Sequence, residues 1–242
     1  MQASLLITTF ERDELLAYGL ASISQQAIMD TGNVEIIVLN DGYNSPETEE
    51  ISLIHSARYF WTGQHKHARW RVPGYALNIG ARQAKGEWLI LSCAEMFHIN
   101  SCIKGLLETE DEKALSIPRG WDDDGRFLES LRRSEKFNYT ELGNLRIELP
   151  FLLTVHRKKF LDIGGYDEDF TGQSYDDDDL IMRLLESGCY YRRTEERCIH
   201  LFHNRNTADK RAAGRLAHNK KLFETRQGQV FRNEGRRWGQ LL

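Results

Sequence analysis

Several features that define other protein classes are missing from this chain of 242 residues. No run of apolar residues approaches the roughly 20 that a helix needs to cross a bilayer. The N-terminal segment has no basic stretch and turns acidic at once, so it does not resemble a signal peptide. We therefore expect a cytoplasmic protein without a transmembrane segment.

Cysteine is also scarce, and its spacing carries no metal-binding signature. The four residues are never paired as CxxC, which is typical of reduced thiols in a cytosolic protein. A zinc site built on them is the alternative. They are Cys93, Cys102, Cys189 and Cys198.

Neither positive nor negative charge dominates the composition. There are 32 Lys and Arg residues against 36 Asp and Glu residues, and the net charge of −4 excludes a general polyanion binder. Basic residues do cluster after about Arg192. A basic helix over 207–226 either docks on a membrane or nucleic acid or packs as a solvated helix. Because it lacks a strong apolar face, the packing helix is favoured.

Strand and helix signals alternate through the first half of the chain. Short apolar runs predict strands at 3–9, 34–39, 57–61 and 88–91, and helical spacing predicts helices at 12–26, 46–56 and 75–84. This alternation is typical of a parallel sheet covered by helices on both faces. Ligands bind beyond the carboxyl ends of such strands, so residues 8–12, 40–43 and 93–96 are of interest.

The second half is less regular. We expect strands at 115–118, 149–155, 190–193 and 198–202, helices at 157–163, 177–186 and 207–226, and long loops over 121–145. Trp88 lies in a predicted strand and is expected in the core, whereas Trp121 is the best candidate for an acceptor contact.

Four groups of residues have the chemistry of a site. Asp176 to Asp179 form an acidic run, either a helix cap or a metal site or general base. Glu95 follows a strand and is either a solvated carboxylate or part of a site at the carboxyl edge of the sheet. His200 and His203 are three residues apart, and they are either metal ligands or one buried, hydrogen-bonded histidine and one surface histidine. The run 122–125 is either an acidic metal motif or a turn. Together these oxygen and imidazole donors suit Mn²⁺ or Mg²⁺ holding a diphosphate.

The order of the motifs resembles the family 2 glycosyltransferases of the GT-A fold, with similarities to galactosyltransferases and polypeptide sugar transferases. The matching segments span about residues 4–230, and three positions depart from the family pattern: Asn40, Leu77 and Cys93. The last replaces the first acid of the Asp-x-Asp metal motif. The segments are LLITTFERDELL, VLNDGYNS, RVPGYALNIGARQAKGEWLIL, IGGYDEDF, YDDDDLIMRLLESG and HNKKLF.

The resemblance implies an α/β, Rossmann-like and mostly parallel sheet flanked by helices, with a smaller acceptor-side sheet and a C-terminal helix. It implies a single domain over 1–242, in which 1–98 bind the nucleotide-sugar, 99–206 form the acceptor half and 207–242 form a basic helical appendage.

The resemblance also implies an inverting, metal-dependent transfer from a nucleotide-sugar, with UDP as the expected nucleotide, to an acceptor hydroxyl such as that of a glycan. Asp177 is the expected base and Asp176 an acceptor contact. Glu95 and His200 are the expected ligands of Mn²⁺ or Mg²⁺, with His203 as second choice. The expected donor contacts are Thr8, Thr9, Phe10, Arg12, Asn40, Asp41, Asn78 and Ala94.

Two rival interpretations follow from the same residues. One is a non-catalytic module that binds a nucleotide-sugar or glycan with a degenerate metal motif. The other is a nucleotidyltransferase, which the residues after the first strand disfavour because 8–12 contain no glycine for a phosphate loop. No clear nucleic-acid site is expected.

Overall fold

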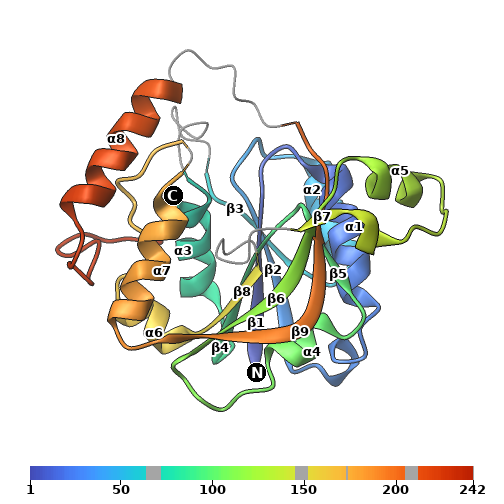
Figure 1. Ribbon diagram of the computed structural model, residues 1–242, viewed down its shortest axis with the longest axis horizontal. Coiled ribbons are helices and arrows are strands. Elements are labelled where there is room, and N and C mark those ends of the chain that lie inside the picture. The colour runs from blue at the N-terminus through green and yellow to red at the C-terminus, as the bar shows by residue number, and fades with distance from the viewer. Residues whose placement is uncertain (64–71, 145–151, 173, 205–211, 242) are drawn as a thin grey trace.

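A nine-stranded sheet forms the centre of the molecule in a computed structural model that describes residues 1–63, 72–144, 152–172, 174–204 and 212–241 (Figure 1). Its order is β3-β2-β1-β4-β8-β6-β9-β5, and β7 pairs with β6. The strands are β1 (Ala3–Thr9), β2 (Val34–Asn40), β3 (Arg58–Trp61), β4 (Trp88–Cys93), β5 (Met96–Ile99), β6 (Ala114–Asp122), β7 (Gly143–Asn144), β8 (Leu152–His156) and β9 (Tyr190–His200).

Helices cover both faces of this sheet (Figure 1). They are α1 (Asp13–Ser24), α2 (Pro46–Ile54), α3 (Pro73–Gln83), α4 (Cys102–Leu106), α5 (Arg126–Arg132), α6 (Arg157–Asp162), α7 (Asp176–Glu186) and α8 (Ala212–Thr225).

The alternation of side chains along β1 explains the layers. Leu5 and Ile7 point into a core cluster that includes residues of α1 and α4, whereas Leu6 belongs to the opposite cluster with α3, α6 and α7. Successive strand residues face opposite sides, so a strand that is apolar throughout is buried on both faces. Trp88 is 5% exposed, in agreement with its predicted place in the core.

The predicted elements of the first half are confirmed to within about two residues at their ends, which is the usual uncertainty of such boundaries. β3, β2, β1 and β4 are mutually parallel. The short strand β5 and helix α4 were not predicted. The predicted helices at 157–163 and 177–186 correspond to α6 and α7.

Three predictions for the second half are wrong. The strands expected at 190–193 and 198–202 are one strand, β9, because β9 pairs with β6 on both sides of a bulge in its polar middle. The loops expected over 121–145 contain α5, the end of β6 and the strand β7. Strands expected in a smaller sheet instead continue the central one through β4 and β8. Residues 149–151 and 207–211 of predicted elements lie outside the described residues.

The C-terminal segment is fastened to the domain by ion pairs. The Asp179 carboxylate accepts hydrogen bonds from Arg183 Nε at 2.7 Å and from Arg232 Nη2 at 2.6 Å, and all three side chains are less than 5% exposed. Arg226 pairs with the buried Asp167. These basic residues therefore serve the fold, which accounts for part of the C-terminal cluster of positive charge.

None of the helices in the described ranges combines the length and the apolar character needed to span a membrane.

We predict that Asp179→Asn lowers the free energy of unfolding by about 3–5 kcal/mol, because it leaves buried arginines without their counter-charge. Chemical denaturation followed by circular dichroism measures this. Asp162→Asn is the matched control: it breaks an exposed i,i+4 pair with Lys158 and is expected to change stability by less than about 1 kcal/mol. Equal effects of the two substitutions would contradict the prediction.

Candidate active site

The strand ends of the first half meet at one edge of the sheet. Thr8 lies opposite Cys93 and Thr9 opposite Asn40 in the parallel register of β1 with β4 and β2. Carboxyl ends of parallel strands share an edge, where α/β proteins bind ligands. The segments expected to hold the donor and the metal, 8–12, 40–43 and 93–96, are thereby brought together.

The far end of the sheet supplies histidine to the same region. β5 pairs with β9 so that Met96 lies opposite His200, and the Leu201 amide donates to the Glu95 carbonyl at 2.7 Å. β6 pairs with β9 on the other side, which places Asp122 opposite His200. Backbone register alone thus puts Glu95, His200 and Asp122 next to one another.

His200 is oriented by a carboxylate. Its Nδ1 lies 2.8 Å from Asp122 Oδ1, and the imidazole is buried. Such a pair fixes the tautomer, with the proton on Nδ1 and the lone pair on Nε2, as carboxylates do for metal-binding histidines. The His203 ring packs edge-on at 5.2 Å between centroids. Burial lowers the pKa of His203, which keeps this imidazole neutral.

Arg12 lies between two of the expected metal ligands. Its Nε is 3.3 Å from Glu95 Oε1, and its Nη2 is 3.3 Å from His203 Nδ1 and 3.2 Å from the Asn204 carbonyl. The Glu95 side chain is 15% exposed, so this pair is shielded from bulk water. A fixed cation therefore sits beside the carboxylate that was expected to bind a metal ion.

The run at 122–125 is a turn and helix start, which decides between its two interpretations. Asp123 is buried and accepts hydrogen bonds from the amides of Gly125 and Phe127 through Oδ1, and from Leu128 and Phe202 through Oδ2. This is the capping role of an aspartate at a helix N-terminus.

The acidic run begins helix α7 after an unusual stretch of backbone. Ser174 and Tyr175 have φ of +76° and +71°, a region that non-glycine residues rarely adopt and that concentrates at functional sites. The turn delivers Asp176 into the interior, where its Oδ2 has no hydrogen-bond partner among the described residues. Burial, followed by the neighbouring charge of Asp177, raises the pKa of Asp176 well above its usual range.

Asp177 has the properties of a general base. The Tyr166 hydroxyl donates a hydrogen bond to its Oδ1 at 3.1 Å. Burial raises the pKa of Asp177 to about 6, although the Tyr166 bond lowers it. A carboxyl group tuned close to neutral pH suits proton transfer. Sequence reasoning missed Tyr166 as its partner, although this residue lies in the motif IGGYDEDF.

A glycine shapes the turn that carries Tyr166. Gly165 has φ of +64°, and a Cβ there would lie 2.3 Å from Asn78 Oδ1. The Asn78 amide accepts from the Tyr166 backbone N–H at 2.8 Å and donates to the Tyr166 carbonyl at 2.9 Å. Helix α3 is thereby bound to the turn that positions the partner of Asp177.

The thiol of Cys93 connects the two parts of the site. Burial raises the pKa of Cys93 well above its usual range, and the negative charges of Glu95 and Asp177 raise it further. The field of Asp177 therefore reaches the end of β4, and the thiol stays neutral. The charges of Glu95 and of Asp177, the candidate base, thus both act on the Cys93 thiol.

On the donor side, Asp41 is buried and accepts a hydrogen bond from the Thr62 hydroxyl. Thr8 donates to the Ser92 carbonyl at 3.5 Å. The Thr9 hydroxyl is buried without a hydrogen-bond partner in the described part of the chain, whereas Phe10 is 37% exposed. An unsatisfied buried hydroxyl beside an exposed aromatic ring is consistent with a ligand site.

Three expected donor contacts have other roles. Asn40 donates to the Tyr43 carbonyl and accepts from the Gly42 amide, which builds the turn after β2. Asn78 is fully buried in its bonds to Tyr166, and the Ala94 methyl is 1% exposed. These side chains shape the site from within, and their contact with a donor stays a prediction.

A model of glycosyl transferase family 2 matches residues 4–162, which are 159 of the 242 residues. The chain belongs to glycosyltransferase family 2. A second model, for the N-terminal domain of galactosyltransferase, matches residues 151–207 of this family 2 glycosyltransferase. The two matches meet near β8 and together include both the Glu95 and the His200 segments.

The relatives of this glycosyltransferase are longer proteins. It is 26% identical over 237 residues to chondroitin synthase of Escherichia coli, an alignment that covers 79% of this chain and 33% of that protein. The crystal structure of GalNAc-T7 with UDP, GalNAc and Mn²⁺ superposes with a TM-score of 0.66 at 15% identity, covering 92% of this chain and 48% of that one. TarS of S. aureus superposes at 0.60 and 14% identity, covering 97% and 45%. These structural similarities establish the GT-A fold.

The side chains at this edge offer a carboxylate and imidazoles as metal ligands. These groups fit a hard or borderline divalent cation. Within the described ranges, however, no three His, Cys, Asp or Glu side chains stand close enough to hold a metal ion. A metal bound by Glu95 has to share this carboxylate with the Arg12 guanidinium or displace it. Of the acidic run, Asp179 is committed to Arg183 and Arg232 and takes no part.

We predict that Arg12→Gln strengthens Mn²⁺ binding to the donor-free protein by about fivefold or more, because a positive charge next to Glu95 is removed. Electron paramagnetic resonance of free Mn²⁺ measures the affinity. Arg132→Gln is the control, since it removes an equal charge from an exposed pair with Glu14. If Arg12→Gln binds Mn²⁺ no better than the control, the guanidinium does not compete with the metal.

We predict that Tyr166→Phe raises the pKa of Asp177 above its value of about 6, because the hydrogen bond that favours the carboxylate is lost. Carboxyl ¹³C NMR titration reads this directly. The acid limb of the pH–activity profile is expected to move upward with it, since the base works only when deprotonated. An unmoved titration would show that the Tyr166 hydroxyl does not set this pKa.

Proposed function

We propose that this family 2 glycosyltransferase transfers a sugar from a nucleotide-sugar, with UDP as the nucleotide, to an acceptor hydroxyl with inversion at the anomeric carbon. The single observation that carries the proposal is the strand register that brings the ends of β1, β2 and β4, with Glu95 and His200, to one edge of the sheet. Groups that bind the donor and its diphosphate at one edge are what positions a direct displacement.

The donor contacts come from the loops after β1 and β2. Asp41, held by Thr62, is proposed to bind the ribose or base, and the exposed Phe10 ring lies on the same loop as Thr9 and Arg12. The GalNAc-T7 structure with UDP supports this choice of nucleotide because the two chains share the fold. The hexose or N-acetylhexosamine carried by the donor is set by contacts beyond these residues.

Glu95 and His200 are the residues we propose to hold Mn²⁺ or Mg²⁺, with His203 as the second imidazole. When bound, such an ion neutralises charge on the diphosphate leaving group. Asp122 then acts through His200, because it holds the imidazole in one orientation. Arg12 is placed to bind phosphate oxygens when it leaves Glu95, since a guanidinium matches the geometry of phosphate.

Asp177 is proposed to accept the proton of the attacking hydroxyl. The acceptor oxygen forms a bond to the anomeric carbon while the bond from that carbon to the diphosphate breaks, and its electron pair leaves with the nucleotide. Tyr166 positions the Asp177 carboxylate. Asp176, whose raised pKa keeps it protonated, is available to donate a hydrogen bond to the acceptor.

The alternative is a module that binds a nucleotide-sugar or glycan without turnover. The observation that favours it is Arg12 paired with Glu95 next to a neutral Cys93, which leaves the metal motif with fewer negative charges than Asp-x-Asp. The two functions differ in whether a bound donor is ever consumed.

We predict that the wild type hydrolyses or transfers from at least one UDP-sugar in the presence of Mn²⁺, and that Asp177→Asn lowers turnover by a factor of about 100 or more. A screen of nucleotide-sugars by nucleotide release measures turnover, and calorimetry is expected to show unchanged donor binding.

Asp178→Asn is the matched control, since Asp178 is the exposed neighbour on the same helix. We expect it to retain most of the wild-type turnover. Near-native turnover of Asp177→Asn would exclude Asp177 as the base. Donor binding by the wild type without any turnover, across acceptors and metals, would favour the binding module.

A further inference from the structure

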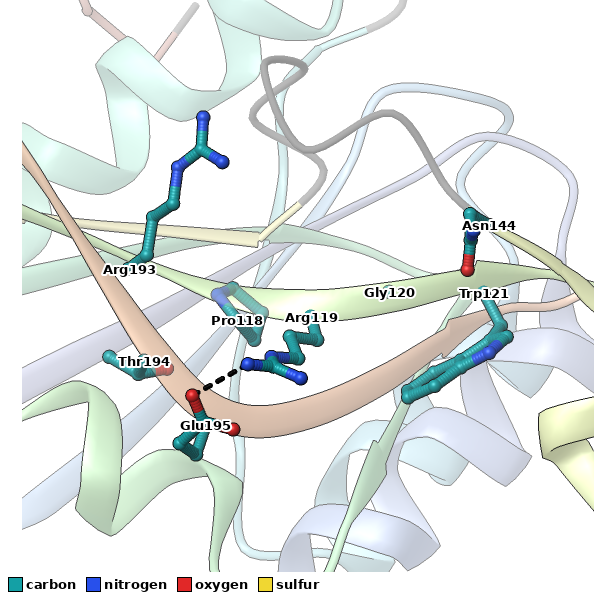
Figure 2. Close-up of a pocket in the computed structure, with 8 residues that line it drawn as sticks. All are labelled: Pro118, Arg119, Gly120, Trp121, Asn144, Arg193, Thr194 and Glu195. Carbon is teal, nitrogen blue, oxygen red and sulfur yellow. Dashed lines mark hydrogen bonds and ion pairs between the residues drawn. The ribbon is translucent and has the colours of Figure 1, made fainter.

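A hollow of about 400 Å³ lies beside the candidate site, between β6, β7 and β9 (Figure 2). This volume is that of a small-ligand pocket. Its lining includes Arg119, Trp121, Asn144, Arg193, Thr194 and Glu195. Apart from Trp121, the expected acceptor contact, none of them has a role in the transfer proposed above.

An irregularity in strand pairing opens the hollow. Ile117 pairs with Arg193 and Arg119 pairs with Arg197, so β6 advances two residues while β9 advances four. The extra residues form a bulge, closed by a hydrogen bond from the Thr194 hydroxyl to the Ile117 carbonyl at 3.2 Å. Bulges are common next to active sites, where they redirect side chains.

The hollow lies close to the site along β6. Trp121 directly precedes Asp122, the partner of His200, although successive strand residues face opposite sides of the sheet. At about 3.3 Å per residue, Arg119 lies about 10 Å along the strand from Asp122. The hollow therefore lies near the end of β6 that carries the candidate site.

Its walls combine an aromatic ring with planar polar groups. Trp121 is partly buried and held edge-on by Tyr139, with ring centroids 5.1 Å apart, so its indole is fixed. Asn144 lies opposite Trp121 across β6 and β7. A rigid aromatic face for C–H groups beside an amide for hydroxyls suits a sugar ring.

The charge of the hollow favours an anion. Arg193 is exposed, extends away from the other side chains in Figure 2, and has no hydrogen-bond or ion-pair partner among the described residues. Arg119 pairs with Glu195 at 2.7 Å, but both side chains are more than half exposed, and such pairs are weak. Two guanidinium groups against one carboxylate leave a net positive charge.

We propose that this hollow binds a carboxylate-bearing sugar of the acceptor glycan, with Arg193 contacting the carboxylate and Trp121 packing against the ring. The inference rests on the proposed function, because it assigns the substrate class of the same enzyme. Glu195 then acts as an internal counter-charge that the bound carboxylate replaces on Arg119.

The test uses the full chain and calorimetry without donor. The probe is a tetrasaccharide of alternating hexuronate and N-acetylhexosamine, and the matched ligand is the same tetrasaccharide with its carboxyl groups reduced to alcohols. We expect the carboxylated form to bind about tenfold tighter, as for a charge-assisted pair with arginine. Equal affinities for the two ligands would overturn the inference.

Substitutions in the hollow test which residues bind the carboxylate. Arg193→Gln is expected to remove most of the preference and Arg193→Lys to keep part of it, whereas Arg237→Gln, an exposed arginine outside the hollow, keeps all of it. Glu195→Gln is expected to tighten binding of the carboxylated form, a gain that misfolding cannot produce. A preference that survives Arg193→Gln and ignores Glu195→Gln would place the anion elsewhere and overturn the inference.

Donor hydrolysis is measured on the same preparation, so that the two proposals fail separately. Hydrolysis of a donor together with equal tetrasaccharide affinities overturns the inference and leaves the enzyme. Absence of hydrolysis together with carboxylate-dependent binding overturns the proposed transfer and leaves the hollow as a glycan-binding site.

Discussion

The site depends on the register with which β9 lies between β5 and β6. Met96, His200 and Asp122 occupy one row across these strands, and the next amide of β9 binds the Glu95 carbonyl. A slip of one residue in any strand turns its side chains to the other face of the sheet. His200 would then leave Asp122 and point into the opposite layer. Main-chain pairing between distant segments, more than any side-chain contact, therefore brings Glu95, His200 and Asp122 together.

At the same edge of the sheet, the Glu95 carboxylate already has a positive charge beside it without any ligand. Cys93 replaces an acid with a neutral thiol, and Arg12 adds a cation next to Glu95. A nucleoside diphosphate brings negative charge to which both Arg12 and a divalent metal are attracted. In the proposed function donor and metal binding are linked, since phosphate oxygens would offer Arg12 a new partner and release the Glu95 carboxylate.

Sequence reasoning succeeded where burial leaves a pattern. The strands 3–9 and 88–91 are apolar because both faces of the parallel sheet are covered, and that signal survives in a single sequence. Sequence reasoning failed where the structure of a segment depends on the segment that pairs with it. The middle of β9 reads YYRRTEER, an exposed and polar stretch that is a strand only because β6 pairs with it. The residues expected at the site included Glu95, Asp177 and His200. Sequence reasoning did not show that Asn40 is used in its own turn after β2, or that Asn78 binds the turn of Tyr166, 88 residues away in the sequence.

The four consecutive aspartates at 176–179 also show that a single sequence does not reveal the partner of each side chain. Asp176 and Asp177 are turned inward at the start of α7, Asp178 faces water, and Asp179 is locked to Arg183 and Arg232. A raised pKa means that the fold holds the proton more tightly than the unfolded chain does, so the stability that protonated Asp177 contributes at low pH is lost as the pH rises from the unfolded pKa to about 6. The paired Asp179, less than one helical turn away, anchors the helix that bears this strain. The candidate base Asp177 and the Asp179 ion pairs that hold its helix therefore belong to one structural unit, although both residues are aspartates.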